Sequence, residues 1–387
     1  MLNFDFTEEQ EKMRKNVRKF WAEEVPNEYG RHIDETKEFP ADLWQKIADQ
    51  GWLGFPFPKE YGGGGGTIVD QALLLNEISR GLFVAGFRYL LTTCFGGNTI
   101  NVFGTHEQKK RYLTKIASGE YKWSLALTEP GGGTDILGST ITNARLDGDS
   151  WVVNGQKTFI SGATESAYFT LFARTNDNPA IKNKAFTLFV IDAKSPGISI
   201  TKIHKLGVRA CPTCDVFFDN VRIPKENVIG KVDDGWYHLV DTLNNERITV
   251  AAFCVGLADA ALEEMIDYAK KRVAFGRPIS TFQSLQNQIT DVYVKLEQAK
   301  LILYRAAWLQ SQRKPVFEAG TMAKLVCSEV AHQASVVGMR VLAGAGYTKN
   351  FSMERHYRDA ILFLCAPISN ESAKNQLAIS LGLGKSF

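Results

Sequence analysis

The chain has 387 residues, enough for two or three domains with ample hydrophobic cores. Hydrophobic residues make up 44% and charged residues 22%, which is the composition of an ordinary globular protein. The 45 Lys and Arg residues exceed the 42 Asp and Glu residues by only 3, so the charge gives no indication of a nucleic-acid or membrane-surface binder.

Targeting and metal-binding signals are missing from the sequence. No run approaches the roughly 20 apolar residues that span a bilayer, and the first ten residues lack the layout of a secretory signal. Cys211 and Cys214 have C-x-x-C spacing, but no second pair or nearby histidine completes a zinc site, so structural loop cysteines are favoured over redox or metal use. We therefore expect a cytoplasmic protein without structural metal.

The chain up to residue 121 has the pattern of a helical domain. Thr7 and Gln10 have the spacing of a capping box at the start of an amphipathic helix. Gly51 is a suitable end for a second helix that begins after Pro40. Further helical segments are expected at about 68–80, 83–103 and 107–117. The sequence thus predicts an N-terminal helical domain over residues 1–121.

A β domain is expected over residues 122–232. Asp147-Gly148 and Asn154-Gly155 are hairpin signals between alternating segments. The expected strands cover residues 140–146, 151–153, 156–161, 168–174, 185–191 and 214–218. This pattern is typical of a β-barrel or sandwich.

The helical period returns for the remaining residues, 233–387. Long amphipathic segments joined by short loops predict an antiparallel four-helix bundle, with helices over about 236–273, 281–312, 315–342 and 353–363. The fold class expected for the whole chain is α+β and multidomain, in the order helical, β, helical.

Glu246 is a candidate catalytic residue from its position alone. It falls inside the apolar stripe formed by Leu239, Leu243 and Val250 rather than on the polar helix face. A buried carboxylate is paired, neutralised or functional, because burying its charge alone is costly. Arg247 is the candidate partner for a buried ion pair. The pattern leaves an ion pair and a catalytic base equally open.

A glycine-rich segment, Thr128–Asp135, follows an apolar strand. Exposed backbone N–H groups in such a turn can approach a flavin or a phosphate closely. Neither this cluster nor the glycine run at 62–66 has the spacing of a dinucleotide fingerprint or a P-loop. A plain turn is the alternative.

A basic connection, Lys271–Ser280, joins two of the predicted long helices. Arg272 and Arg277 have the planar donor groups that bind a pyrophosphate. A solvated helix end, where cations oppose the helix dipole, is the alternative and is favoured by this segment alone.

Seven motifs in order give the chain a resemblance to the acyl-CoA dehydrogenase family, from Phe4 to about Leu381. They are Thr128–Asp135, Asn154–Lys157, Phe159–Ser161, Lys205–Arg209, Arg272–Gly276 with Gln283, Ala343–Gly346 and Arg358–Ala360. The resemblance implies FAD as cofactor, helical, β-barrel and helical domains, and a homotetramer or homodimer.

The same resemblance implies a set of ligand-contacting residues. The cofactor-binding positions would be Leu127, Thr128, Gly133, Thr134, Phe159, Ser161, Arg272, Phe275, Gln283, Arg340, Gly344, Ser369 and Glu371. Arg272, Phe275 and Gln283 would reach the FAD of a neighbouring subunit. Arg340 departs from the usual glutamine. Thr134, Asn244 and Arg247 would contact the thioester substrate.

The usual catalytic glutamate of the family is missing. Pro367 stands at its position, and proline has no side chain that accepts a proton. Some members place the base just before the arginine of the first helix of the C-terminal domain, and Glu246-Arg247 matches that location. The resemblance therefore favours Glu246 as the base, with Glu371 as the weaker candidate.

The implied reaction is α,β-dehydrogenation of an acyl-CoA or other acyl thioester, an oxidoreductase reaction on a CH–CH group in acyl-CoA metabolism. Glu246 would take the α-proton while the β-hydrogen leaves as hydride to the flavin, and electrons would pass to an electron-transferring flavoprotein. The alternatives are a reductase, a carrier-protein thioester dehydrogenase or a flavin-dependent monooxygenase on the same fold, and a degenerate paralogue without activity.

Overall fold

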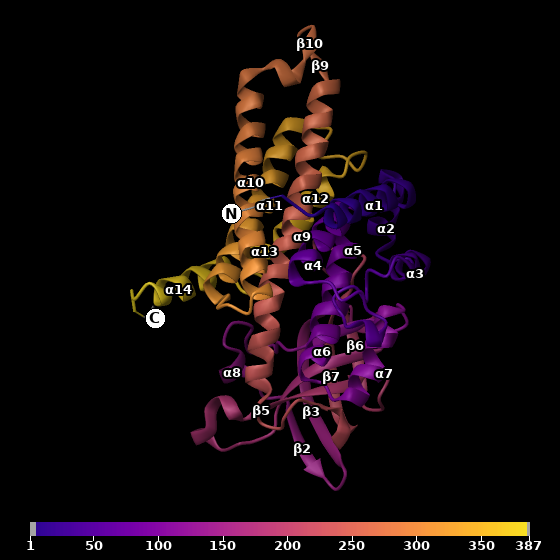
Figure 1. The fold of residues 1–387 in the computed structure, drawn as a ribbon, viewed down its shortest axis with the longest axis vertical. Helices are drawn as coiled ribbons and strands as arrows, with labels where there is room; N and C mark the ends of the chain where they lie inside the picture. The colour runs from indigo at the N-terminus through magenta and orange to yellow at the C-terminus, as the bar shows by residue number, and fades with distance from the viewer. Residues whose placement is uncertain (1–4, 385–387) are drawn as a thin grey trace.

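The computed structural model describes residues 5–384. Figure 1 shows a β domain at one end of the molecule and a helical bundle at the other, with the N-terminal helices packed along one side. The helix α9 (Gly235–Lys271) is 37 residues long and extends from the β domain through the bundle. The expected helical, β and helical arrangement is confirmed.

The N-terminal helices begin where the sequence predicts. The capping box of Thr7 and Gln10 is present, and equivalent boxes start two later helices at Thr67 and Thr105. The elements are α1 (Glu8–Glu24), α2 (Asn27–Thr36), α3 (Ala41–Asp49), η1 (Lys59–Tyr61), α4 (Ile68–Gly81), α5 (Phe83–Tyr89), η2 (Leu90–Asn98), α6 (Thr99–Phe103) and α7 (His106–Ala117). The helix α2 was not expected.

The segment 83–103 is helical but not one regular helix. Its centre, η2, is a nine-residue π-helix between α5 and α6. Gly96 and Gly97 lie directly against aromatic rings there, since an added Cβ would come within 2.4 Å of Trp123 and 2.1 Å of Phe57. π-helical turns are uncommon and often mark functional sites.

The β domain is built on one mixed sheet with the strand order β6-β7-β3-β2-β4-β5-β8, and β1 pairs with β4. The strands are β1 (Trp123–Ala126), β2 (Asn143–Asp147), β3 (Ser150–Ser161), β4 (Tyr168–Arg174), β5 (Phe186–Asp192), β6 (Ile198–Ile203), β7 (Thr213–Pro224) and β8 (Val228–Ile229). The short helices between them are α8 (Ile136–Ser139), η3 (Ala163–Glu165), η4 (Pro179–Lys184) and η5 (Lys225–Asn227).

One of the two predicted hairpin turns is wrong. Asp147 and Ser150 flank a tight turn between β2 and β3, as expected. Asn154-Gly155 instead lies inside β3, where the pairing with β7 shifts register. Gly155 has φ 149°, and an added Cβ would come within 2.4 Å of Thr142. The glycine therefore permits a bulge and a close approach rather than a turn.

The C-terminal domain continues after α9 through a small hairpin, β9 (Val273–Ala274) and β10 (Arg277–Pro278), and η6 (Ile279–Thr281). Its further helices are α10 (Gln283–Ser311), α11 (Phe317–Leu342), α12 (Met353–Ala360), α13 (Leu362–Cys365) and α14 (Asn370–Ser380). The predicted fourth helix is thus divided between α12 and α13. The helix α14 was not expected, and it projects from the bundle in Figure 1.

A buried ion pair joins the loop after β1 to β3. Lys157 Nζ lies 2.8 Å from Glu129 Oε1 and also donates to the carbonyl of Leu127 at 2.8 Å. The Glu129 carboxylate also accepts from the backbone N–H groups of Ile141 and Thr142. Burial lowers the pKa of Lys157 to about 8, although the carboxylate opposes the shift. The loop 128–141 is therefore held against the sheet at several points.

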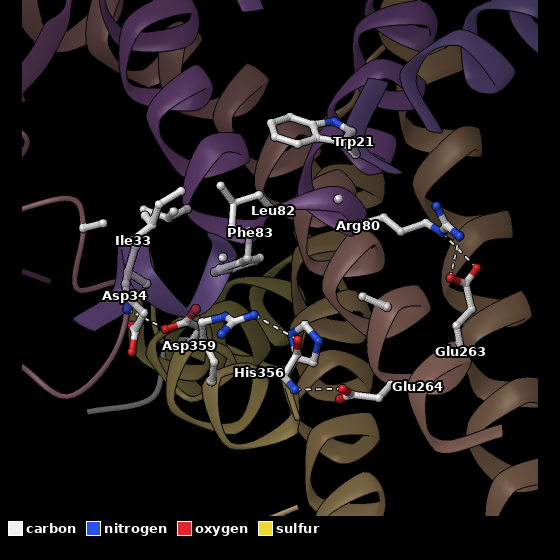
Figure 2. Close-up of a pocket in the computed structure, with 18 of the residues that line it drawn as sticks. Trp21, Ile33, Asp34, Arg80, Leu82, Phe83, Glu263, Glu264, His356 and Asp359 are labelled. Carbon is white, nitrogen blue, oxygen red and sulfur yellow. Dashed lines mark hydrogen bonds and ion pairs between the residues drawn. The ribbon is translucent and has the colours of Figure 1, made fainter. Parts of the chain in front are cut away.

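A second polar cluster joins the three parts of the chain and borders a cavity of about 410 Å³ (Figure 2). Arg358 on α12 donates to Asp34 on α2 at 2.7 Å, and Asp359 accepts from the backbone N–H of Val208 at 2.5 Å. The cavity wall includes Trp21 and none of the predicted site residues. This cluster fixes the β domain between the N- and C-terminal helices.

Within residues 5–384, no helix combines the length and the apolar character needed to cross a membrane. The same part of the chain holds no group of three or more His, Cys, Asp or Glu side chains placed to bind a metal ion. Cys211 and Cys214 are buried and both thiols are free.

The Glu129–Lys157 pair yields a prediction about stability. Glu129→Ala leaves the Lys157 ammonium buried without a counter-charge, so the free energy of unfolding should fall by about 3–5 kcal/mol in urea denaturation. Asp147→Ala is the matched control, because it removes an exposed pair with Arg222 and should cost about 0.5 kcal/mol. Equal losses in the two variants would contradict the role given to the buried pair.

Candidate active site

The Glu246 carboxylate is buried, as its place in the apolar stripe predicts. Glu246 is 4% exposed, and no described group donates a hydrogen bond to its carboxylate oxygens. Burial raises the pKa of Glu246 to about 8, while the positive charges of Arg247 and Lys324 oppose the rise. A carboxylate with this pKa can both accept and donate a proton near neutral pH.

The adjacent Arg247 does not form the ion pair that the sequence left open. Its guanidinium donates to Asn244 and to Gln376 on α14, both at 3.2 Å, and lies 4.8 Å from the ring centre of Phe317. Within the described chain no ion pair links Arg247 to Glu246. The predicted substrate residues Asn244 and Arg247 therefore lie together on α9 beside Glu246.

The π-helix η2 connects the Glu246 region with the β domain. On one side, Cys94 accepts from Asn245 of α9 at 3.5 Å, and burial, followed by the Glu246 charge, raises the pKa of this thiol to about 12. On the other side, Leu91 faces Gly162, directly after Ser161 at the end of β3. Glu246 and Ser161 therefore flank the same element.

The predicted flavin-contacting residues of the β domain lie close together. Thr128 donates to the carbonyl of Thr158 at 2.6 Å, and the backbone N–H of Thr158 returns a bond of 2.8 Å to the Thr128 carbonyl. This places the loop of Leu127, Gly133 and Thr134 beside the end of β3. Leu127 packs into the core, whereas Gly133 and Thr134 are exposed.

Phe159 has the features of a ligand-contacting aromatic residue. It lies at the second register shift of β3, its φ is 59°, and its side chain is 66% exposed. A left-handed conformation costs a bulky residue about 1–2 kcal/mol, so such a site points to a functional constraint. The exposed ring and the open backbone at Gly133 fit the flat ring system of a flavin.

The predicted contacts to a second FAD lie at the opposite end of the molecule. Arg272, Phe275 and Gln283 surround the β9–β10 hairpin, which Figure 1 places far from the β domain. Phe275 is 96% exposed and has φ 52°. One chain therefore does not bring these three residues together with Phe159.

The remaining predicted cofactor residues lie on and around α11. Arg340 and Glu371 line one groove, a cavity of about 450 Å³ between α11 and the start of α14. Ser369 caps α14 by accepting from the backbone N–H of Ser372 at 3.1 Å. Gly344 follows α11, and an added Cβ there would meet no atom within 4 Å. Glu371 is exposed, unlike Glu246.

A cavity of about 610 Å³ at the two residues that precede Glu246 was not predicted. Asn244 and Asn245 form part of its wall, and Arg313 and Lys314 also line it. Gln310 donates to Asn245 at 2.8 Å and fixes this amide at the wall. The two consecutive cations after α10 were visible in the sequence, but only the fold places them at the cavity that Asn244 and Asn245 line.

Comparison with family models matches the chain in three consecutive segments. The N-terminal domain of acyl-CoA dehydrogenase matches residues 7–120, its middle domain residues 124–221 and its C-terminal domain residues 233–378.

Three curated relatives are similar over nearly the whole chain. A probable acyl-CoA dehydrogenase, YngJ of Bacillus subtilis, is 36% identical and covers 93% of this chain and 94% of its own. A 3-(aryl)acrylate reductase of Clostridium sporogenes is 38% identical, with 92% and 93% covered. The CarC subunit of a caffeyl-CoA reductase-Etf complex of Acetobacterium woodii is 35% identical, with 92% and 94% covered.

Solved structures have the same fold. A glutaryl-coenzyme A dehydrogenase in complex with glutaryl-CoA superposes with a TM-score of 0.95 at 31% identity, covering 99% of this chain and 98% of that one. An FAD complex of PigA superposes with a TM-score of 0.93 at 28% identity, covering 99% and 100%. With three matching domains and relatives similar over more than nine-tenths of its length, the chain belongs to the acyl-CoA dehydrogenase family.

Proposed function

We propose that the protein transfers hydrogen between the α- and β-carbons of an acyl thioester with FAD as cofactor, and that Glu246 moves the α-proton. The observation that carries this proposal is the buried Glu246 carboxylate, whose pKa of about 8 suits proton transfer at Cα. It lies across η2 from the loop and strand that fit a flavin.

The chain's own residues account for the proton step. A thioester α-proton is weakly acidic, so the base must be close to it and poorly hydrated. Glu246 meets the second condition because apolar helices surround it, and η2 closes the side toward the β domain. Bound FAD would supply the acceptor for the β-hydrogen as hydride, next to Phe159 and Ser161.

The assignment of Glu246 also depends on the two competing positions. Pro367 occupies the position of the usual family glutamate and offers no proton acceptor. Glu371 is exposed in the groove beside Arg340, whereas Glu246 is buried. Glu246 is the carboxylate whose surroundings match the task.

The 610 Å³ cavity is the proposed route for the arm of the thioester. Its amide wall of Asn244, Asn245 and Gln310 can hydrogen-bond an amide-containing arm such as pantetheine. Arg313 and Lys314 would bind the phosphate groups of that arm. Thr134, exposed on the loop after β1, remains a proposed contact of the same ligand.

We also propose a homo-oligomer and an electron-transferring flavoprotein as partners. The exposed Phe275 with Arg272 and Gln283 would contact the flavin of a second copy, because they are too distant from Phe159 of their own chain. A relative that is 35% identical is a subunit of a reductase-Etf complex, which supports the second partner.

Reduction of an α,β-unsaturated thioester is the second candidate, and one observation favours it. With a pKa of about 8, Glu246 holds its proton at pH 7 in the free site, and a reductase must deliver a proton to Cα. Two relatives, 38% and 35% identical to this chain, are a reductase and a subunit of a reductase complex. The same residues would serve oxidation of the saturated thioester and reduction of the unsaturated one.

Replacement of the base gives the first test. Glu246→Gln should retain FAD, since the residue lies outside the loop after β1 that is proposed to contact the flavin. Anaerobic flavin bleaching by a panel of acyl-CoA and carrier-protein thioesters should slow by about 10²–10⁴-fold. Glu371→Gln tests the weaker candidate base and, with FAD saturating, should bleach near the unmodified rate. Normal bleaching in Glu246→Gln would refute the assignment.

The direction of pH dependence follows from the raised pKa. Oxidation needs the Glu246 carboxylate ionised, so the bleaching rate should rise about tenfold from pH 7 to 9 and level off above the pKa of about 8. Reduction of an enoyl thioester by the reduced enzyme needs the protonated form and should fall over the same range. Single-turnover absorbance at each pH measures both, and a flat oxidation profile would contradict the proposal.

Phe159→Gly separates stability from cofactor binding. Glycine tolerates φ 59°, so the apoprotein should be as stable or up to about 1 kcal/mol more stable, while loss of the ring should weaken FAD binding at least about fivefold. Phe217→Gly, at an exposed position of β7, is the control and should destabilise without affecting FAD. Fluorescence titration and thermal unfolding provide the readouts, and unchanged FAD affinity in Phe159→Gly would count against the flavin contact.

A further inference from the structure

The cavity of about 410 Å³ in Figure 2 lies where the three domains meet. Its wall is formed by the ends of α1 and α4 with part of α2, by residues 208–210 of the β domain, and by α9 and α12. Small-molecule pockets have volumes of about 300–1,000 Å³, so this cavity is large enough for a small ligand. Its wall includes none of the residues assigned above to the flavin, the thioester or the proton step.

Part of the wall is apolar. Trp21, Ile33, Leu82 and Phe83 line the cavity, and all four side chains are buried (Figure 2). The indole Nε1 of Trp21 is buried as well, yet no described residue accepts a hydrogen bond from it. This part of the wall can cover the hydrocarbon portion of a ligand and leaves one donor unused.

Helix α12 presents a polar face to the same cavity. Ser352, Arg355, His356 and Asp359 have the spacing of one helix face, and all four line the wall. Asp359 is occupied by the backbone N–H of Val208. Burial lowers the pKa of His356 to about 3, so its imidazole is neutral at pH 7. The buried Nδ1 of this ring has no hydrogen-bond partner among the described residues.

A guanidinium and a carboxylate meet at Ser352 without forming an ion pair. Arg355 Nη2 donates to Ser352 Oγ at 2.9 Å, and the Ser352 backbone N–H donates to Glu264 Oε1 at 2.7 Å. Within residues 5–384, neither Arg355 nor Glu264 takes part in an ion pair, and Glu264 Oε2 is buried without a donor. Since both groups contact the same residue, one small ligand can reach both charges.

Other charged groups in the wall already have partners of opposite charge. The ion pairs are Arg80 with Glu263, Arg18 with Glu77, Arg209 with Asp34, and Asp267 with Lys271. The cation and the anion that remain available to a ligand are therefore those of Arg355 and Glu264.

We propose that this cavity binds a small zwitterion of the amino-acid type, with its carboxylate on Arg355, its ammonium on Glu264 and its apolar side chain toward Trp21. A guanidinium binds a carboxylate through two parallel hydrogen bonds, and a carboxylate accepts strongly from an ammonium. The His356 Nδ1 is a further acceptor for the ammonium.

The arrangement of charges selects against ligands with a single charge. A simple carboxylate would leave Glu264 without a partner, and a simple amine would leave Arg355 without one. An uncompensated charge in a partly buried site is costly, so both should bind more weakly than the zwitterion. This inference is independent of the proposed function, because the cavity and the candidate active site share no residue.

The test is isothermal titration calorimetry of the FAD-loaded protein with L-leucine and L-phenylalanine. At least one of them should bind, and it should raise the midpoint of thermal unfolding, because it binds the folded chain. The analogues that lack one charge are 4-methylpentanoate and 3-methylbutylamine for leucine, and 3-phenylpropanoate and phenethylamine for phenylalanine. Each should bind at least about tenfold more weakly than its amino acid.

Two substitutions locate the binding. Arg355→Gln and Glu264→Gln each remove one charge and keep a polar side chain, so each should weaken binding at least about tenfold. Arg145→Gln is the matched control, because Arg145 forms an exposed pair with Asp177 in the β domain. Its affinity for the amino acid should equal that of the unmodified protein.

Three results would overturn the inference. They are the failure of both amino acids to bind, equal affinity for an amino acid and its singly charged analogues, and unchanged affinity in both Arg355→Gln and Glu264→Gln. The analogues examine the same two charges on the unmodified protein, so the first two results do not depend on whether a variant folds.

Discussion

The buried contact between Glu129 and Lys157 is the constraint on which the candidate site most depends. It ties the loop after β1 to β3 in a region closed to water, and four backbone or side-chain bonds converge on the two residues. Breaking such a pair leaves a charge that nothing nearby can solvate, so the loop has little freedom to move. The positions of Thr128 and Phe159 follow from it, because Thr128 directly precedes Glu129 and Phe159 lies two residues after Lys157.

Glu246 is controlled by a different balance. Apolar packing from α9 and η2 makes its ionised form costly, while the charges of Arg247 and Lys324 reduce that cost. A carboxylate in water would remain ionised and weakly basic, and one buried without nearby cations would remain protonated. The pKa of about 8 lies between these limits, where either direction of hydrogen transfer is accessible at moderate pH.

Local sequence patterns predicted the features that depend only on residues close together in the chain. The start of the first helix at Thr7 and the inward position of Glu246 both follow from residue spacing along a single helix. Both predictions are confirmed. Asn154-Gly155 was misread because the same dipeptide suits a turn and a bulge, and only the approach of Thr142 decides between them. The π-helix, the place of Arg313 and the cavity lined by Arg355 and Glu264 depend on contacts between distant segments. Family resemblance supplied the predicted flavin contacts, and the fold places six of these residues on β3 and the loop after β1.

The hairpin formed by β9 and β10 has a consequence for assembly. Its exposed Phe275 lies at the far end of the chain from Phe159. A flavin that touches both ends must therefore lie between two polypeptides, and each monomer then holds only part of a binding pocket. In the proposed homo-oligomer, cofactor retention would be a bimolecular property: dilution that separates the chains would also release FAD, and the dissociation constants of subunit and cofactor would be thermodynamically linked.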